Sequence, residues 1–268
     1  MSEIPRSPSV IVLNRNLAFR GLVKSVALKL NFHTQAKSVE NFVRTVVYRI
    51  SWGRKPYVEF YRKTVSRRAA ISPWWAVGNT GQKSWEQHGL QFHQYLISQG
   101  MRPEDVMLDI GCGNLRIGVH AIAYLNLGNY WGIDISPENI AQGWEFVADH
   151  GLDSKTPHLF VNDDLQFKEM AGTKADFVFA NSVFTHIPAH LIEECISSLA
   201  TTMKATGAFF VTFNEGASKF HAEATDNFYY SRDFFTELCK CYSYVVTFDD
   251  EFPHPHRQTM MIIRSDKP

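Results

Sequence analysis

Two glycines and two aspartates provide the first chemical signal in this sequence. Asp109 is followed closely by Gly111 and Gly113, and Asp134 lies 25 residues after Asp109. Glycine has no Cβ, so the chain can turn tightly at these positions and bring its backbone against a ligand. A carboxylate at position 134 can accept hydrogen bonds from the vicinal hydroxyls of a ribose. Together these residues predict a site for a nucleoside-containing cofactor.

The spacing around the glycines argues against two common nucleotide sites. The dinucleotide fingerprint GxGxxG needs a third glycine for close packing of helix on strand, and Arg116 stands at that position. The P-loop pattern GxxxxGK[ST] does not occur in the sequence. NAD and ATP are therefore disfavoured as the nucleoside.

The glycines and aspartates fall at the ends of apolar runs that predict strands. Such runs occur at 106–110, 130–134, 158–161, 176–180, 207–213, 244–248 and 259–263. Helices are predicted between them, at 84–99, 115–125, 137–149, 189–203 and from Ser231 onward. This alternation is typical of a parallel sheet with helices on both faces, whose ligands bind at the carboxyl ends of the strands. The last two strands have no helix between them, so one of them is expected to run antiparallel.

Two of these strand ends resemble motifs I and II of the class I S-adenosylmethionine-dependent methyltransferases. Residues 106–113 read VMLDIGCG, and residues 132–136 read GIDIS. The resemblance covers about residues 84–264. It implies an α/β fold: a Rossmann-like, seven-stranded, mostly parallel sheet with an antiparallel last strand. One departure is Leu115, which replaces a third glycine that many members carry.

The resemblance implies S-adenosyl-L-methionine as the cofactor and assigns it a set of residues by position. These are Asp109, Gly111, Cys112, Gly113, Asp134, Ile135, Asp163, Asp164 and Asn181. The two glycines would face the methionine part, Asp109 would hold the loop and the amino group, and Asp134 would bind the ribose. Each has a structural alternative: the glycines as a turn alone, and Asp134 as a cap of the next turn.

The ends of the third and fourth strands carry the rest of the predicted cofactor site. Asp163, with Asp164 as its neighbour, stands where the family offers a carboxylate to the adenine amino group. Both could instead be ordinary loop carboxylates. Two adjacent acids also suit a metal, but the spacing places no third ligand, so no metal is predicted. Asn181, in a segment that resembles motif IV, would lie near the methionine group.

Histidines supply the candidates for a general base. A histidine with a pKa of about 6.5 suits removal of a proton from a hydroxyl acceptor. His186 is the first candidate, with a structural role in its own turn as the alternative, and His254 and His256 are the second candidates. Glu215 and His221 are expected to line the acceptor pocket. The segment before the first strand is expected to bring Trp85 or Gln91 near the cofactor.

These residues predict O-methylation of a hydroxylated small molecule or glycan by in-line methyl transfer. An N- or C-methyltransferase of a small molecule is the alternative within enzymes. The nucleic-acid amino methylases often carry an Asp/Asn-Pro-Pro-Phe/Tyr motif after the fourth strand, and residues 180–184 do not match it. A non-catalytic scaffold that binds the cofactor is the alternative outside enzymes.

Charge divides the chain into two parts. Residues 1–70 contain 14 Lys and Arg against 3 Asp and Glu, and the rest contains 13 against 24. Apolar residues at helical spacing predict amphipathic helices at 14–32 and 38–50, and a third apolar and basic segment runs through 57–68. Pro73 then marks a boundary.

We therefore predict a basic helical N-terminal extension over residues 1–72 and a methyltransferase domain over residues 73–268. The extension could cap the domain, form a homodimer surface or lie on an anionic membrane surface through residues 14–68. Nucleic acid is the least favoured partner, since no recognised binding motif is present.

The four cysteines form no CxxC pair, which favours reduced thiols in a cytoplasmic protein. No secretory signal is expected, because residues 1–6 are not followed by a long apolar core, and no spanning helix is expected, because no apolar run approaches roughly 20 residues.

Overall fold

The computed structural model describes residues 54–268, except residues 80, 171, 218–220, 225–226 and 267–268. The chain divides into two compact units after Gly53. The helices predicted at 14–32 and 38–50 lie outside the described residues. Residues 54–72, which the sequence assigns to the extension, fall in the same unit as residues 73–268. No helix in the described part of the chain is long and apolar enough to cross a membrane.

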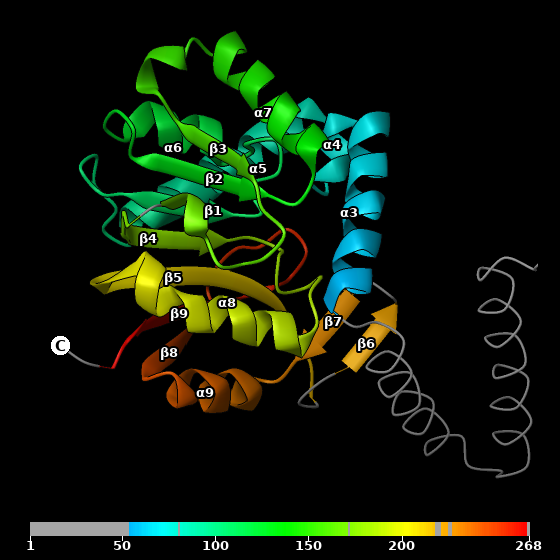
Figure 1. The fold of residues 1–268 in the computed structure, drawn as a ribbon, viewed down its shortest axis with the longest axis vertical. Coiled ribbons are helices and arrows are strands. Elements are labelled where there is room, and N and C mark those ends of the chain that lie inside the picture. The colour runs from blue at the N-terminus through cyan, green and yellow to red at the C-terminus, as the bar shows by residue number, and fades with distance from the viewer. Residues whose placement is uncertain (1–53, 80, 171, 218–220, 225–226, 267–268) are drawn as a thin grey trace, which may run out of the picture. The chain divides into compact units, whose positions relative to one another are not determined.

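A mixed sheet forms the centre of the domain (Figure 1). Its strands are β1 (Met107–Ile110), β2 (Tyr130–Asp134), β3 (His158–Val161), β4 (Ala175–Ala180), β5 (Met203–Glu215), β6 (His221–Ala224), β7 (Asn227–Tyr230), β8 (Tyr244–Asp249) and β9 (Thr259–Ser265). Strands β3, β2, β1, β4 and β5 are parallel neighbours in that order. Strand β9 runs antiparallel between β5 and β8. The predicted Rossmann-like sheet with an antiparallel last strand is confirmed.

Two short strands extend the sheet beyond the predicted seven. Strand β7 pairs in parallel with the end of β5, through Asn214 with Tyr229 and Glu215 with Tyr230, and β6 pairs antiparallel with β7. The sequence did not reveal them because their pairing is determined by the end of β5, a strand of 13 residues that extends beyond its other neighbours.

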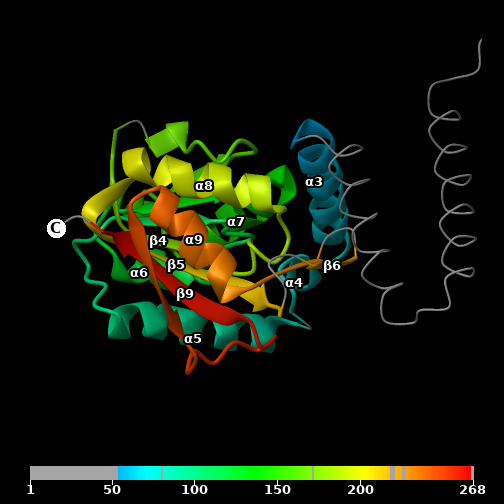
Figure 2. The same cartoon turned by 90° about the horizontal axis from the view of Figure 1, so that it is seen from below.

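The helices are α3 (Arg54–Ile71), α4 (Pro73–Ala76), α5 (Gln82–Ser98), α6 (Gly118–Tyr124), α7 (Pro137–Asp149), α8 (Ala189–Thr202) and α9 (Arg232–Cys241). Figure 2 shows α8 on one side of the sheet and α5 on the other. The hydroxyl oxygens of Ser136 and Ser231 cap α7 and α9 as predicted, accepting from Asn139 N at 3.3 Å and Phe234 N at 3.2 Å. Helix α5 starts earlier than predicted: Gly81 is its N-cap, and Ser84 lies inside the first turn.

Helix α3 stands across the carboxyl edge of the parallel strands (Figure 1). The segment 57–68 was expected to belong to a basic extension, but it packs here with its apolar and aromatic side chains turned inward. Tyr57 and Ala69 are almost fully buried. Gln142 of α7 donates to the carbonyl of Ala69 at 3.1 Å. The edge where a parallel sheet binds ligands is therefore covered by residues from the start of the described chain.

Candidate functional site

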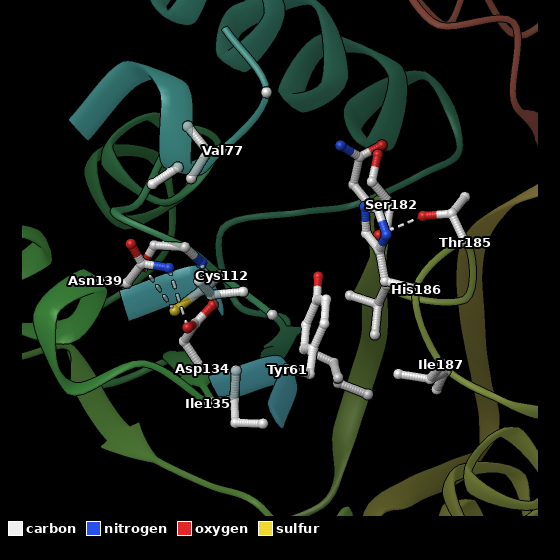
Figure 3. A pocket seen from close by; sticks show the side chains of 18 of the residues that line it. Tyr61, Val77, Cys112, Asp134, Ile135, Asn139, Ser182, Thr185, His186 and Ile187 are labelled. Carbon is white, nitrogen blue, oxygen red and sulfur yellow. Dashed lines mark hydrogen bonds between the residues drawn. The ribbon is translucent and has the colours of Figure 1, made fainter. Parts of the chain in front are cut away.

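A cavity of about 610 Å³ lies between the carboxyl ends of the strands and α3 (Figure 3). Residues that follow β1, β2, β3 and β4 line one side of it, and side chains of α3 line the other. Its volume is in the range of small-molecule and cofactor sites. Of the predicted site residues it contains Asp109, Gly111, Cys112, Gly113, Asp134, Ile135, Asp163, Asn181, His186 and His256.

The loop after β1 depends on its two glycines. Gly111 has φ +69° and Gly113 has φ +58°, a region in which a side chain is strained. A Cβ on Gly111 would lie 2.5 Å from Cγ2 of Val183, and one on Gly113 would lie 2.5 Å from Cγ1 of Val77. The loop therefore keeps its bare backbone against the cavity.

The carboxylate of Asp134 fastens this loop to the end of β2. Its Oδ2 accepts from the backbone N–H of Gly113 at 3.0 Å, and its Oδ1 accepts from Ser136 N at 2.8 Å and Asn139 Nδ2 at 3.1 Å. Burial raises the pKa of Asp134, while these three donors act in the opposite direction. A carboxylate offers about four acceptor positions, so one is left for a ligand. Asp134 thus both fastens the loop and can accept one ribose hydroxyl.

Asp109 and Arg116 are two ionisable residues that line the cavity near the loop. Burial raises the pKa of Asp109 to about 7, and the hydroxyl of Tyr130, which donates to its Oδ2 at 2.7 Å, opposes that shift. Arg116 donates to the carbonyl of Val77 at 2.9 Å and lies 5.3 Å above the ring of Phe92. Burial lowers the pKa of Arg116 to about 10, so its side chain stays cationic at neutral pH.

The cavity-lining role of Arg116 was missed from the sequence. The position had been used only to argue against a dinucleotide fingerprint. Its place in the turn that leads into α6 was the available signal, because a cation there can reach a ligand held on the glycine loop.

The two adjacent acids after β3 point to different places. Asp163 lines the cavity, and its Oδ2 lies 3.6 Å from Nη1 of Arg62 on α3. Asp164 is turned into its own loop, where its Oδ1 accepts from Asn162 Nδ2 at 3.2 Å and Gln166 N at 2.9 Å. Of the two predicted adenine contacts, the structure brings Asp163 to the cavity and leaves Asp164 outside it.

The far end of the cavity is built from aromatic side chains and His186. The imidazole ring of His186 stacks on Tyr61 with 5.6 Å between centroids. The hydroxyl of Tyr57 donates to the backbone carbonyl of His186. His256 also lines the cavity, with its Nε2 3.3 Å from the carbonyl of Gly78. We refer to this region of Tyr57, Tyr61, Ser182, His186 and Tyr229 as the acceptor end.

The two tyrosines of the acceptor end were also missed from the sequence. Tyr57, Tyr61, Val65 and Arg68 occupy positions i, i+4, i+8 and i+11 of α3, which is one helical face, and all four line the cavity. That stripe was the available signal.

Other predicted residues lie away from the cavity. His254 is buried beneath it. Glu215 is paired with Arg232, with 2.9 Å between Oε1 and Nε, and the side chain of His221 lies outside the described residues. Trp85 and Gln91 do not reach it either: Trp85 supports the loop from behind through a 2.9 Å hydrogen bond to Oδ1 of Asn114.

The residues around the loop fit a nucleoside joined to an amino acid. The glycines leave a cradle for a ligand, Asp134 has one acceptor position free, and Asp109 and Arg116 suit an ammonium and a carboxylate. Two buried polar atoms of cavity-lining residues, Nδ2 of Asn181 and Oδ1 of Asn139, have no hydrogen-bond partner among the described residues. Within the same part of the chain, no three His, Cys, Asp or Glu side chains gather as metal ligands.

Comparison with known proteins agrees with this geometry. Residues 108–209 match a family model described as a methyltransferase domain. The structure is similar to magnesium protoporphyrin IX methyltransferase from Synechocystis PCC 6803 with bound S-adenosylmethionine, at 15% identity over 78% of this chain and 97% of that chain, with a TM-score of 0.60. It is also similar to DhpI in complex with S-adenosylhomocysteine, at 16% identity over 80% and 98%, with a TM-score of 0.54.

A third similar structure is an S-adenosylmethionine-dependent methyltransferase from Clostridium acetobutylicum ATCC 824, at 12% identity over 74% and 97%, with a TM-score of 0.54. At these identities the likeness establishes a shared fold, while the family match adds sequence evidence for the segment that carries the glycine loop.

Proposed function

We propose that this protein transfers the methyl group of S-adenosyl-L-methionine to a hydroxyl oxygen of a small molecule or glycan. The match of residues 108–209 to a family model described as a methyltransferase domain supports the reaction class. The observation that carries the proposal is a single cavity with two unlike ends. The cofactor end has the glycine loop with Asp109, Asp134 and Asp163. The acceptor end has tyrosines and His186. A donor and an acceptor can therefore be held in contact within one enclosure.

The cofactor end supplies binding and orientation. Gly111 and Gly113 would hold the methionine part, Asp134 would accept from a ribose hydroxyl, and Asp163 would face the adenine. Asp109 would lie near the ammonium group. The bound cofactor would supply a methyl group already activated by its sulfonium, so the protein mainly has to align the acceptor with it.

The acceptor end favours a hydroxyl over an amine. The carboxylates among the described residues that line the cavity are Asp109, Asp134 and Asp163, and all three belong to the cofactor end. The acceptor end therefore has no lining carboxylate to attract an ammonium ion. The ring of His186, held against Tyr61, is the candidate that would take the proton from the hydroxyl. Its backbone carbonyl is fixed by Tyr57, so the ring position depends on α3 being in place.

A panel of acceptors tests this proposal. Transfer of a labelled methyl group would be measured to phenols, sugars and other alcohols, and to amines of matched size. His186→Ala should lower turnover about 10²–10⁴-fold with little change in affinity for S-adenosylhomocysteine, since the hydrogen bond from Tyr57 goes to the backbone. His150→Ala, at an exposed position outside the cavity, is the matched control.

Methylation of the amines alone would contradict O-methylation and favour the N-methyltransferase alternative. Binding of S-adenosylhomocysteine without transfer to any member of the panel would favour a non-catalytic scaffold.

A further inference from the structure

A hydrogen-bonded network lies below the cavity floor, where β4 ends. His254, which is only 8% exposed, places its Nε2 3.0 Å from Oδ1 of Asn181. The backbone N–H of Ser182 donates to Oγ1 of Thr212 at 2.7 Å, and that hydroxyl donates to Oε1 of Gln258 at 2.7 Å. Asn181 lines the cavity above this network, whereas His254 does not.

The tautomer of His254 follows from its other ring nitrogen. The backbone N–H of His256 lies 3.2 Å from Nδ1 of His254. A backbone N–H can only donate, so Nδ1 accepts and carries no proton. A neutral imidazole has one donor and one acceptor nitrogen, and Nε2 therefore bears the proton. Burial and the nearby Arg116 lower the pKa of His254 to about 3, which keeps the ring neutral at working pH.

This tautomer fixes the orientation of the Asn181 amide. A protonated Nε2 needs an oxygen opposite it, so Oδ1 of Asn181 faces His254 and Nδ2 faces away. Thr212 does not compete strongly for that oxygen, since it lies 3.4 Å away and donates to Gln258 at a shorter distance. The amide nitrogen is then left buried with no hydrogen-bond partner among the described residues. An unsatisfied buried donor is costly unless a ligand atom completes it.

The residues around Asn181 indicate which kind of ligand atom its Nδ2 would bind. Arg116 and His254 both lie against the ring of Phe92: the guanidinium is 5.3 Å from the ring centroid, and the imidazole stacks on the ring with 5.6 Å between centroids. Asn181 is two residues past Phe179, which pairs with Asp109 of β1, so the amide stands at the level of the glycine loop. A cation and an N–H donor at this level suit an anionic oxygen pair, and a carboxylate has that chemistry.

We propose that His254 is a positioning residue that locks the Asn181 amide with its N–H toward the cavity, where it binds the carboxylate of the cofactor's methionine part together with Arg116. This inference rests on the proposed function. It assigns His254, which sequence analysis treated as a candidate base, a role that acts through Asn181 and needs no proton transfer.

Titration calorimetry with two probes tests the proposal. S-adenosylhomocysteine carries the amino-acid carboxylate, and 5′-methylthioadenosine keeps the nucleoside but lacks it. His254→Phe, which keeps an aromatic ring against Phe92 but removes the N–H, should bind S-adenosylhomocysteine about tenfold more weakly. Its affinity for 5′-methylthioadenosine should stay within twofold of the parent. His254→Gln, which restores an N–H donor, should bring the first affinity back toward the parental value.

Asn181→Asp gives a second measurement that does not depend on the folding of His254→Phe. An oxygen replaces the nitrogen that faces the cavity, so S-adenosylhomocysteine should bind at least tenfold more weakly while 5′-methylthioadenosine does not.

Equal losses for both probes, or no loss for either, would overturn the positioning role while leaving the methyltransferase proposal intact. Failure of the folded parent to bind either probe would instead overturn the proposed function.

Discussion

The two ends of the cavity are built in different ways. At the cofactor end, the hydrogen bonds of the Asp134 carboxylate join residues close in sequence: Asp134 reaches Gly113 across 21 positions and Ser136 across two. At the acceptor end, Tyr57 reaches His186 across 129 positions. The first end is made by consecutive strand–loop–helix units of one sheet, and the second exists only because α3 packs across the sheet edge.

This difference explains why more of the cofactor end than of the acceptor end was predicted. A glycine with positive φ and a carboxylate at a strand end can each be predicted from a short sequence motif. The tyrosines that α3 contributes cannot be inferred from the sequence around His186, because α3 lies far from it in the chain. We therefore expect the cofactor end to respond sharply to single substitutions in the loop, and the acceptor end to respond to substitutions in α3.

The largest effect is expected for Gly113→Ala. Its Cβ would lie 2.5 Å from Val77, and its φ of +58° is strained for alanine, so affinity for S-adenosylhomocysteine should fall more than tenfold. Gly151→Ala is the matched control, because Gly151 has a similar φ of +66° but no described heavy atom within 4 Å of the added Cβ. Gly151→Ala should lower the free energy of unfolding by about 1–2 kcal/mol and leave the affinity for S-adenosylhomocysteine unchanged. Equal affinities for the two variants would contradict the close approach of the loop to the ligand.

At the acceptor end, Tyr61→Ala should separate the two regions. Loss of the ring that stacks on His186 should reduce kcat/KM for the best acceptor about tenfold, because aromatic pairs contribute about 0.5–1.5 kcal/mol beyond burial. Affinity for S-adenosylhomocysteine should stay within twofold, and Tyr61→Phe should behave like the parent. A loss of cofactor affinity as large as the loss of turnover would show that α3 serves both ends equally.

Acid should destabilise the domain through a histidine outside both ends. Burial lowers the pKa of His93 to about 4, against about 6.5 in an unfolded chain. The unfolded state therefore binds the proton first as pH falls, so the folded state loses stability between pH 6.5 and 4. The loss reaches about 2 kcal/mol at pH 5.

Asp109, whose pKa is raised to about 7, acts in the opposite direction over the same range. The measurement is therefore the difference between His93→Leu and the parent. Urea unfolding at pH 7.5 and pH 5 should show that difference shifting by about 2 kcal/mol in favour of the variant. A constant difference would show that His93 titrates normally in the folded state.

The smallest effect is expected where the two regions meet. The ion pair of Arg62 on α3 with Asp163 after β3 is 3.6 Å long, and both side chains are well exposed to solvent, at 40% and 53%. Arg62→Gln should therefore change the unfolding free energy by less than about 1 kcal/mol and the affinity for S-adenosylhomocysteine by about twofold at most. A tenfold change would mean that α3 takes part in cofactor binding, and the division between the two ends would fail.

Local physical signals account for what could be predicted of the fold. The strands at 107–110 and 130–134, and the caps at Ser136 and Ser231, depend on short apolar runs and single side chains. Strands β6 and β7 were missed because their pairing is determined by the extended end of β5. The start of α5 shifted because Ser84, expected as its cap, lies in the first turn and donates to the carbonyl of Gly81 at 2.9 Å.

The site shows the same division. The glycines and Asp134 could be predicted because they lie in one short segment of the sequence. The hydrogen bonds that occupy most of the Asp134 carboxylate could not be predicted. Tyr61, Arg116 and the link between His254 and Asn181 needed the tertiary structure, since their partners come from different strands and helices.

Titration of the purified protein with S-adenosylhomocysteine, for the parent and for Asp134→Ala, tests the central claim most directly. We expect micromolar binding by the parent, on the order of −8 kcal/mol, and an affinity at least tenfold weaker for the variant, which loses both the loop anchor and the ribose contact. Asp134→Asn, which keeps the size of the side chain, should fall between them. Absence of binding by the well-folded parent would contradict the assignment of this cavity to a methyltransferase cofactor.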